Sequence, residues 1–257
     1  MLYKVEDTFE LAVNNNLCHL PLFTLRNQGN KRIVTDNTNK AIIEMISGKD
    51  LPHGDDDKIF YHMLALCRKN KTNMLVFRTA TECMAVGDIT MPVDRFEKAV
   101  ERLMCVSIIA HRWVEKGKKD KIYFGLFEFM KINKNKKEHT FIIKLSNDLV
   151  KGIDPTLGYW TKLLLSEFDR LTPLARKLYM LLLPFQESKK NIHYDVKFLA
   201  TKLGMSGADT RDIRKLKEEI DKAIKEIDEK TRLNFEMITF KRNKNVMFSK
   251  KENLLDE

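Results

Sequence analysis

Apolar residues recur at helical spacing in the first half of the chain, with short segments of strand character between and after them. Phe96, Leu103 and Val106 fall on one stripe of a helix that Pro92 opens in its first turn. The pattern predicts, in order, a helix from near Asp57, a strand over 74–78, a short helix over 80–86, a helix from near Thr90, and a two-stranded hairpin over 122–145.

The second half of the chain repeats this order, with Gly204 at the place that Gly87 has in the first half. Helix, turn, helix and hairpin in succession are typical of a winged helix-turn-helix. Because a repeated order indicates duplication, we expect an α+β protein of two tandem winged helix-turn-helix domains. The expected second copy consists of a helix over 171–185, a strand over 191–194, a helix over 196–203, a long helix over 209–230 and a hairpin over 235–248.

Breaks in the pattern predict the domain boundaries. Residues 1–50 contain short apolar segments interrupted by asparagine, proline and glycine, so we expect an irregular N-terminal arm packed on the first domain. We place the first winged-helix domain at 51–152 and the second at 153–249, joined by a linker helix around 159–168. Residues 250–257 have little to bury and are expected to form a flexible tail.

Charge and cysteine usage narrow the class of protein. Lys and Arg outnumber Asp and Glu by 46 to 36, a formal net charge of +10, which favours an anionic partner. The 4 cysteines are scattered without a CxxC pair, which argues against a disulfide framework or zinc site and for a reducing compartment. No apolar run approaches the roughly 18 residues of a membrane span. We therefore expect a cytoplasmic protein with no membrane association.

The long helix over 209–230 is the expected reader of DNA. Its apolar residues cluster on one side and leave cations outward, several of them near the positive end of the helix dipole. Each such cation costs about 0.3–1 kcal/mol, whereas a helix that enters the major groove needs cations at its N-terminal end. A solvated face with pairs such as Arg214 with Glu218 is the alternative. The candidate DNA-binding residues of this helix are Arg211, Arg214, Lys215, Lys222 and Lys225.

Both hairpin tips are basic, as a loop that lies along a phosphate backbone must be. The alternative is that lysines protect the hairpin edges from strand pairing. The first-half helix has an outward face of nearly balanced charge, so we expect the first domain to serve backbone contacts and dimerisation or a partner protein. The candidates are Lys134, Lys136 and Lys137 in the first tip, Lys241, Arg242 and Lys244 in the second, and Lys98 and Arg102 on the first-half helix.

Enzyme motifs are missing from the sequence: there is no GxxxxGK, HExxH or GxSxG. Asp55–Asp57 with Lys58, and Asp169 with Glu187, loosely resemble nuclease metal patterns. We expect no catalytic residue, metal or cofactor, and keep a metal-dependent nuclease as the alternative from another class. An interaction module with inert wings is a third alternative.

Leu20–Leu25 and Phe168–Tyr179 resemble segments of the bacterial plasmid initiators called replication initiator protein A. The tandem winged-helix plan also resembles the iteron-binding Rep group. The resemblance implies a non-enzymatic initiator that binds repeats in a plasmid origin as double-stranded DNA and helps to melt adjacent DNA. It also implies recruitment of host replication proteins, such as an initiator ATPase and a helicase, and a homodimer in equilibrium with the monomer. A winged-helix transcription regulator is the alternative within the same fold.

Overall fold

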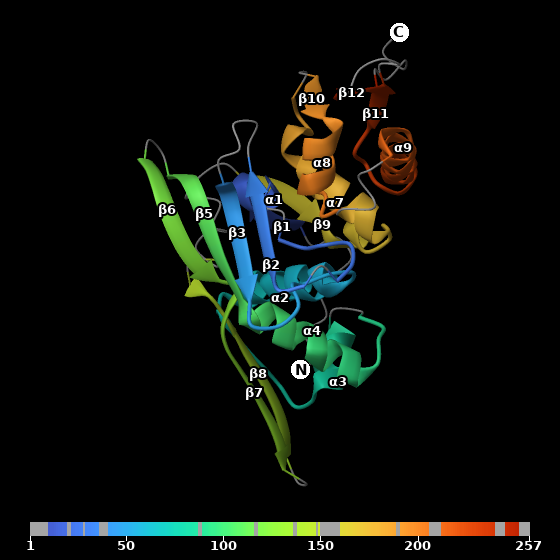
Figure 1. The fold of residues 1–257 in the computed structure, drawn as a ribbon. Helices are drawn as coiled ribbons and strands as arrows, with labels where there is room; N and C mark the ends of the chain where they lie inside the picture. The colour runs from blue at the N-terminus through green and yellow to red at the C-terminus, as the bar shows by residue number, and fades with distance from the viewer. Residues whose placement is uncertain are drawn as a thin grey trace.

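Helix α2 (Asp56–Asn70) lies at the centre of the molecule (Figure 1). Asp56, Asp57 and every residue from Ile59 to Cys67 are buried, so other elements cover this helix on all sides. The structure is a computed structural model that describes residues 10–19, 22–27, 29–35, 41–86, 89–115, 118–135, 138–147, 149, 160–188, 191–205, 212–239 and 245–251.

The first winged unit begins with α2 and has the order predicted from the sequence, apart from an extra hairpin between α4 and the wing. Its three strands form an antiparallel sheet in the order β4-β8-β7. Phe96, Val100 and Leu103 of α4 are buried, as the apolar stripe predicts. After α2 the unit contains β4 (Met74–Phe77), α3 (Ala80–Val86), α4 (Val93–Cys105), β7 (Phe127–Asn135) and β8 (Glu138–Leu145).

The second winged unit has the same element order, and its sheet has the equivalent strand order, β10-β12-β11. In both units the first strand pairs with the third, which pairs with the second. The α+β class is therefore confirmed, with two winged units in tandem. The unit contains α7 (Pro173–Leu182), the 3-10 helix η2 (Leu183–Phe185), β10 (Ile192–Asp195), α8 (Val196–Lys202), α9 (Ile213–Lys230), β11 (Phe235–Thr239) and β12 (Asn245–Lys250).

The predicted hairpin over 122–145 is wrong in its boundaries. Strand β6 (Lys118–Gly125) pairs with β5 (Val106–Glu115), and a separate hairpin begins with β7 at Phe127. Helix α4 is thus followed by two hairpins, and only the second is the wing. Figure 1 shows them extending to opposite ends of the molecule, with β7–β8 at the end away from α9.

The N-terminal segment is more regular than predicted. Strands β2 (Lys31–Thr35) and β3 (Ala41–Ser47) join the inserted hairpin in a four-stranded sheet of order β2-β3-β5-β6. Strand β1 (Glu10–Asn14) leads directly into α1 (Asn15–His19). The expected irregular arm is therefore wrong for these parts of residues 1–50, because their pairing partners lie far away in the sequence.

The predicted linker helix is also largely a strand. Trp160–Leu164 forms β9, which pairs antiparallel with β1 in the register Leu11↔Leu163. Only Leu165–Phe168, α6, is helical. The N-terminal segment thus contacts both units rather than the first alone. The predicted domain boundaries stay predictions.

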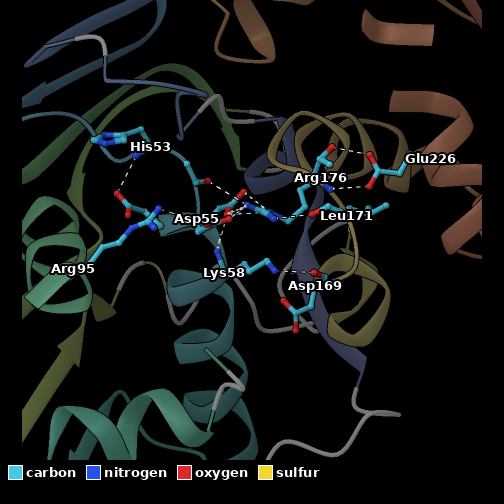
Figure 2. Close-up of polar contacts among 12 residues, drawn as sticks. His53, Asp55, Lys58, Arg95, Asp169, Leu171, Arg176 and Glu226 are labelled. Atoms are coloured by element: carbon cyan, nitrogen blue, oxygen red, sulfur yellow. Dashed lines mark hydrogen bonds and ion pairs between the residues drawn. The ribbon is translucent and has the colours of Figure 1, made fainter. Parts of the chain in front are cut away.

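A buried ion pair joins the two units (Figure 2). The Arg176 side chain, on α7, is 1% exposed, and its Nε donates to both carboxylate oxygens of Asp57 on α2 at 3.1 Å. Its Nη2 donates to Asp55 Oδ1 at 2.8 Å and to the Gly54 carbonyl at 3.2 Å, and its Nη1 donates to the Leu171 carbonyl at 2.8 Å. Burial alone would lower the pKa of Arg176, but Asp57 and Asp55 outweigh it and raise the pKa.

Two further contacts of α2 reach the loop before α7. Lys58 Nζ donates to the Asp169 carbonyl at 2.8 Å, and His62 Nε2 lies 2.8 Å from Asp169 Oδ2. Figure 2 shows Lys58 and Asp169 beside the Arg176 cluster. The contacts between the units thus follow one side of α2 for two turns.

The turn after α8 rests on the N-terminal segment. Gly204 has φ +77, and a Cβ there would lie 2.7 Å from the Phe23 carbonyl oxygen and 3.0 Å from Thr24 Cα. Leu25 N donates to the Gly204 carbonyl at 3.3 Å. Only glycine combines this backbone conformation with so close an approach.

We expect Arg176→Met to lower the free energy of unfolding by about 3–5 kcal/mol, because it leaves the Asp57 carboxylate buried without its partner. Urea denaturation measures the change. Arg214→Met is the control, since that side chain is 89% exposed and should change stability by no more than about 0.5 kcal/mol. Adding Asp57→Leu to Arg176→Met should recover part of the loss. Equal stabilities for Arg176→Met and Arg214→Met would contradict a structural role for the pair.

We expect Gly204→Ala to destabilise the protein by about 1–3 kcal/mol, from the left-handed backbone and the close carbonyl. Gly48→Ala is the matched control, because a Cβ there meets no atom within 4 Å. Thermal unfolding of the two variants tests how the turn at Gly204 packs on the N-terminal segment at Phe23 and Thr24. A midpoint as high for Gly204→Ala as for Gly48→Ala would show that this contact is unimportant.

Candidate nucleic-acid interface

Helix α9 is positioned by its cap and its apolar stripe. Asp212 caps the N-terminus, where its carboxylate accepts from Arg214 N at 2.9 Å and from Lys215 N at 3.2 Å. This negative charge offsets part of the cost of cations at the positive end of the helix. The opposite side is anchored in the core by Leu216, Ile220, Ala223, Ile224 and Ile227, all buried.

The outward face of α9 carries the candidate cations together with acidic side chains such as Glu218. Lys215 and Lys222 are exposed and have no ion-pair partner within the part of the chain that the structure describes. Arg214 is 89% exposed and pairs with Glu218 at 3.1 Å, while Lys225 is 68% exposed and pairs with Asp221 at 2.7 Å. Exposed pairs of this kind contribute about 0.3–0.5 kcal/mol. The side chains can therefore exchange these partners for phosphates at little cost.

The two wing tips lie mostly outside the described residues. Lys134 is part of β7, where its backbone pairs with His139 of β8. The structure thus extends the first wing almost to its turn. The predicted contacts that fall outside the description are Lys136 and Lys137 of the first tip, Lys241, Arg242 and Lys244 of the second tip, and Arg211 before α9.

The two candidates on α4 differ in their surroundings. Lys98 is exposed. The Arg102 side chain is only 16% exposed, and it forms two 2.8 Å hydrogen bonds to the buried carboxylate of Asp56 on α2. Hydrogen bonding to Asp56 raises the pKa of Arg102 despite its burial. The guanidinium edge that would meet a phosphate already holds Asp56, so Arg102 fastens α4 to α2.

The carboxylates with nuclease-like spacing are not gathered into one site. Asp55 and Asp57 bind Arg176, Asp56 binds Arg102, and Asp169 lies against His62. Within the described ranges, no group of three or more His, Cys, Asp and Glu side chains could hold a metal ion. The acidic run instead neutralises the arginines that hold the elements together.

Sequence reasoning missed the role of Arg176, although it predicted the helix over 171–185 to which this residue belongs. Arg176 lies three positions before Tyr179 on the buried side of α7, and this position is the signal that could have marked it. A cation on an apolar stripe requires a buried carboxylate. The run Asp55–Asp57 supplies it from more than 110 residues away along the chain.

No helix among the described residues is long and apolar enough to cross a membrane.

Comparison with known proteins identifies the fold. No family model matches the sequence, and no curated protein matches it. Among solved structures, the crystal structure of selenomethionine derivatives of domains 2 and 3 of RctB matches with a TM-score of 0.58 at 12% identity. It covers 93% of this chain and 98% of that chain. A second crystal structure of RctB domains 2–3 matches with a TM-score of 0.56 at 13% identity, covering 92% and 97%. The chain thus shares the fold of these two domains.

Proposed function

We propose that this chain is a replication initiator that binds specific sequences of double-stranded DNA and has no catalytic site. The observation that carries the proposal is α9. Its apolar side is fixed in the core, and its other side presents Arg214, Lys215, Lys222 and Lys225 to solvent. A basic helix after a helix-turn and before a wing is the arrangement with which such domains enter the major groove.

In this proposal α9 reads bases, and the basic wings neutralise phosphates. The far end of β7–β8 and helix α9 lie at opposite ends of the molecule (Figure 1). The first wing and α9 would therefore contact different parts of one duplex. Two separated contacts from one chain suit a long binding site better than the short site of a single winged domain.

The origin role rests on the resemblance of Leu20–Leu25 and Phe168–Tyr179 to replication initiator protein A. The fold shared with RctB domains 2 and 3 supports it. The finer parts of the proposal are binding to repeats in a plasmid origin, recruitment of host proteins such as an initiator ATPase and a helicase, and a cytoplasmic location.

A homodimer is also part of the proposal. In the four-stranded sheet, Ile33 pairs with Glu44, and Ile109 pairs with Tyr123, so these side chains share one face, to which Ile46 also belongs. Ile33, Ile46 and Tyr123 are 45%, 41% and 62% exposed. This apolar face fits the expectation that the first domain serves dimerisation.

A winged-helix transcription regulator would use the same surface. The two functions differ in the step after binding, because an initiator opens adjacent DNA and a regulator need not. Permanganate reactivity of thymines beside the selected site, on supercoiled DNA, separates them.

We expect selection from a random duplex pool to recover a defined motif, and Arg214→Ala/Lys215→Ala to blur it, because each good base contact is worth about 1–3 kcal/mol. Arg68→Ala/Lys69→Ala is the charge-matched control on exposed residues at the end of α2, and it should recover the wild-type motif. No motif with the wild-type protein would overturn the proposal. If the α9 variant selects the same motif as the wild-type protein, a part of the protein other than Arg214 and Lys215 contacts the bases.

The affinity for the selected site should fall by about 10³–10⁵ between about 50 and 200 mM salt if roughly 6–10 phosphates are contacted. Fluorescence anisotropy at several salt concentrations measures the slope. Replacing Lys134, Lys136 and Lys137 by Ala should reduce this slope and weaken all sequences alike. A flat salt response would contradict binding through the basic wings.

A further inference from the structure

A small cavity lies where the two winged units meet the N-terminal segment. Its volume is about 30 Å³, and α1, α2, α7 and α8 contribute to its wall. A cavity that holds one water needs roughly 10–15 Å³, so this one suits a small ion or a pair of waters. The charged residues that line it are Asp57, Arg176, Lys177 and Lys202, and the aromatic ones are His19, Phe23, Tyr61 and Phe168.

Lys177 places a buried ammonium group in the wall of the cavity. It follows Arg176 on α7, and although part of its stem reaches the surface, its Nζ is buried and has no hydrogen-bond partner in the described part of the chain. Nζ lies over the Phe23 ring, 5.6 Å from the ring centroid. An aromatic face at this distance attracts a cation but leaves its N–H donors unsatisfied.

The carboxylates near the wall balance only part of this charge. Asp57 and Asp55 share the single cation of Arg176, so this cluster carries one excess negative charge. Lys202 Nζ lies 3.5 Å from the His19 carbonyl, which is the outer limit of a hydrogen bond, and 5.5 Å from the centroid of the Phe198 ring. The two ammonium groups of Lys177 and Lys202 are therefore not fully compensated by these carboxylates.

The ionisation of these groups is consistent with an excess of positive charge. Burial lowers the pKa of Lys177 to about 8, with the Asp57 charge opposing the shift, so this amine is still largely protonated at pH 7. Burial also lowers the pKa of Lys202. Burial and the neighbouring Lys202 lower the pKa of His19 to about 4, so the imidazole at the rim is neutral.

We propose that this cavity binds one small inorganic anion of the size of chloride, held by the ammonium groups of Lys177 and Lys202. Water would satisfy the donors but would leave the remaining excess of positive charge in place, whereas an anion compensates it. The volume excludes a nucleotide or a DNA phosphate with its sugar. The anion would tie α7 to α8 and to the segment around Phe23, directly before the turn at Gly204 that leads to α9.

Because only the folded protein assembles the site, a bound anion raises stability by mass action. The test is thermal unfolding at pH 7 and fixed ionic strength as chloride replaces gluconate. The midpoint of the wild-type protein should rise with chloride, and the rise should be lost in Lys177→Met. Lys225→Met is the control, because that lysine is 68% exposed on α9 and its replacement should leave the chloride effect intact.

Two results would overturn the proposal: a wild-type midpoint that is independent of chloride, or a chloride effect that persists in Lys177→Met. If Lys177→Met does not fold, Lys202→Met takes its place, and crystals of the wild-type protein grown in bromide provide a direct readout. An anomalous peak between Lys177 and Lys202 supports the site, and a cavity without such a peak rejects it.

Discussion

The arrangement of the two winged units depends on the neutralisation of three consecutive carboxylates at the start of α2. Asp55 and Asp57 are matched by Arg176 from α7, and Asp56 is matched by Arg102 from α4. A buried carboxylate without a partner is costly, so each of these helices can occupy only the place where its arginine reaches α2. The start of α2 is therefore the point to which α4 of the first unit and α7 of the second unit are both fixed.

This constraint also sorts the basic residues of a chain whose net charge is +10. Arg102 and Arg176 bind the carboxylates at the start of α2, Arg102 through its Nε and Nη2. Among the candidate cations of α9, Arg214 and Lys225 have exposed, weak partners, and Lys215 and Lys222 have no ion-pair partner among the described residues. The net charge does not distinguish the largely buried arginines at the start of α2 from the exposed cations of α9. Their burial does. This difference makes α9 the better candidate for reading DNA and α4 chiefly a structural helix.

The winged units could be predicted from the sequence because the spacing of apolar residues within each helix marks its buried face. The stripes of α4 and α9 repeat at helical spacing, so the buried and exposed faces could be assigned from neighbours a few residues away. Strands β1 and β9 carried no such signal, since each is short and its partner lies about 150 residues away along the chain. The linker was therefore predicted as a helix. Arg102 was predicted to bind DNA for the same reason, because Asp56 is distant in sequence.

The N-terminal segment gives the second unit its orientation as well as a contact. Strand β1 pairs with β9 just before α7, and the backbone at Phe23 and Thr24 leaves no room for a side chain at Gly204, just after α8. The segment of the second unit from α7 to α8 is thus held at both ends, in addition to the Arg176 pair. Helix α9 packs on α7 through its buried stripe and inherits this position. The separation between α9 and the first wing is consequently set by packed contacts rather than by the length of a linker. Under the proposed function, a DNA site that engages both would therefore have to match the protein in spacing as well as in base sequence.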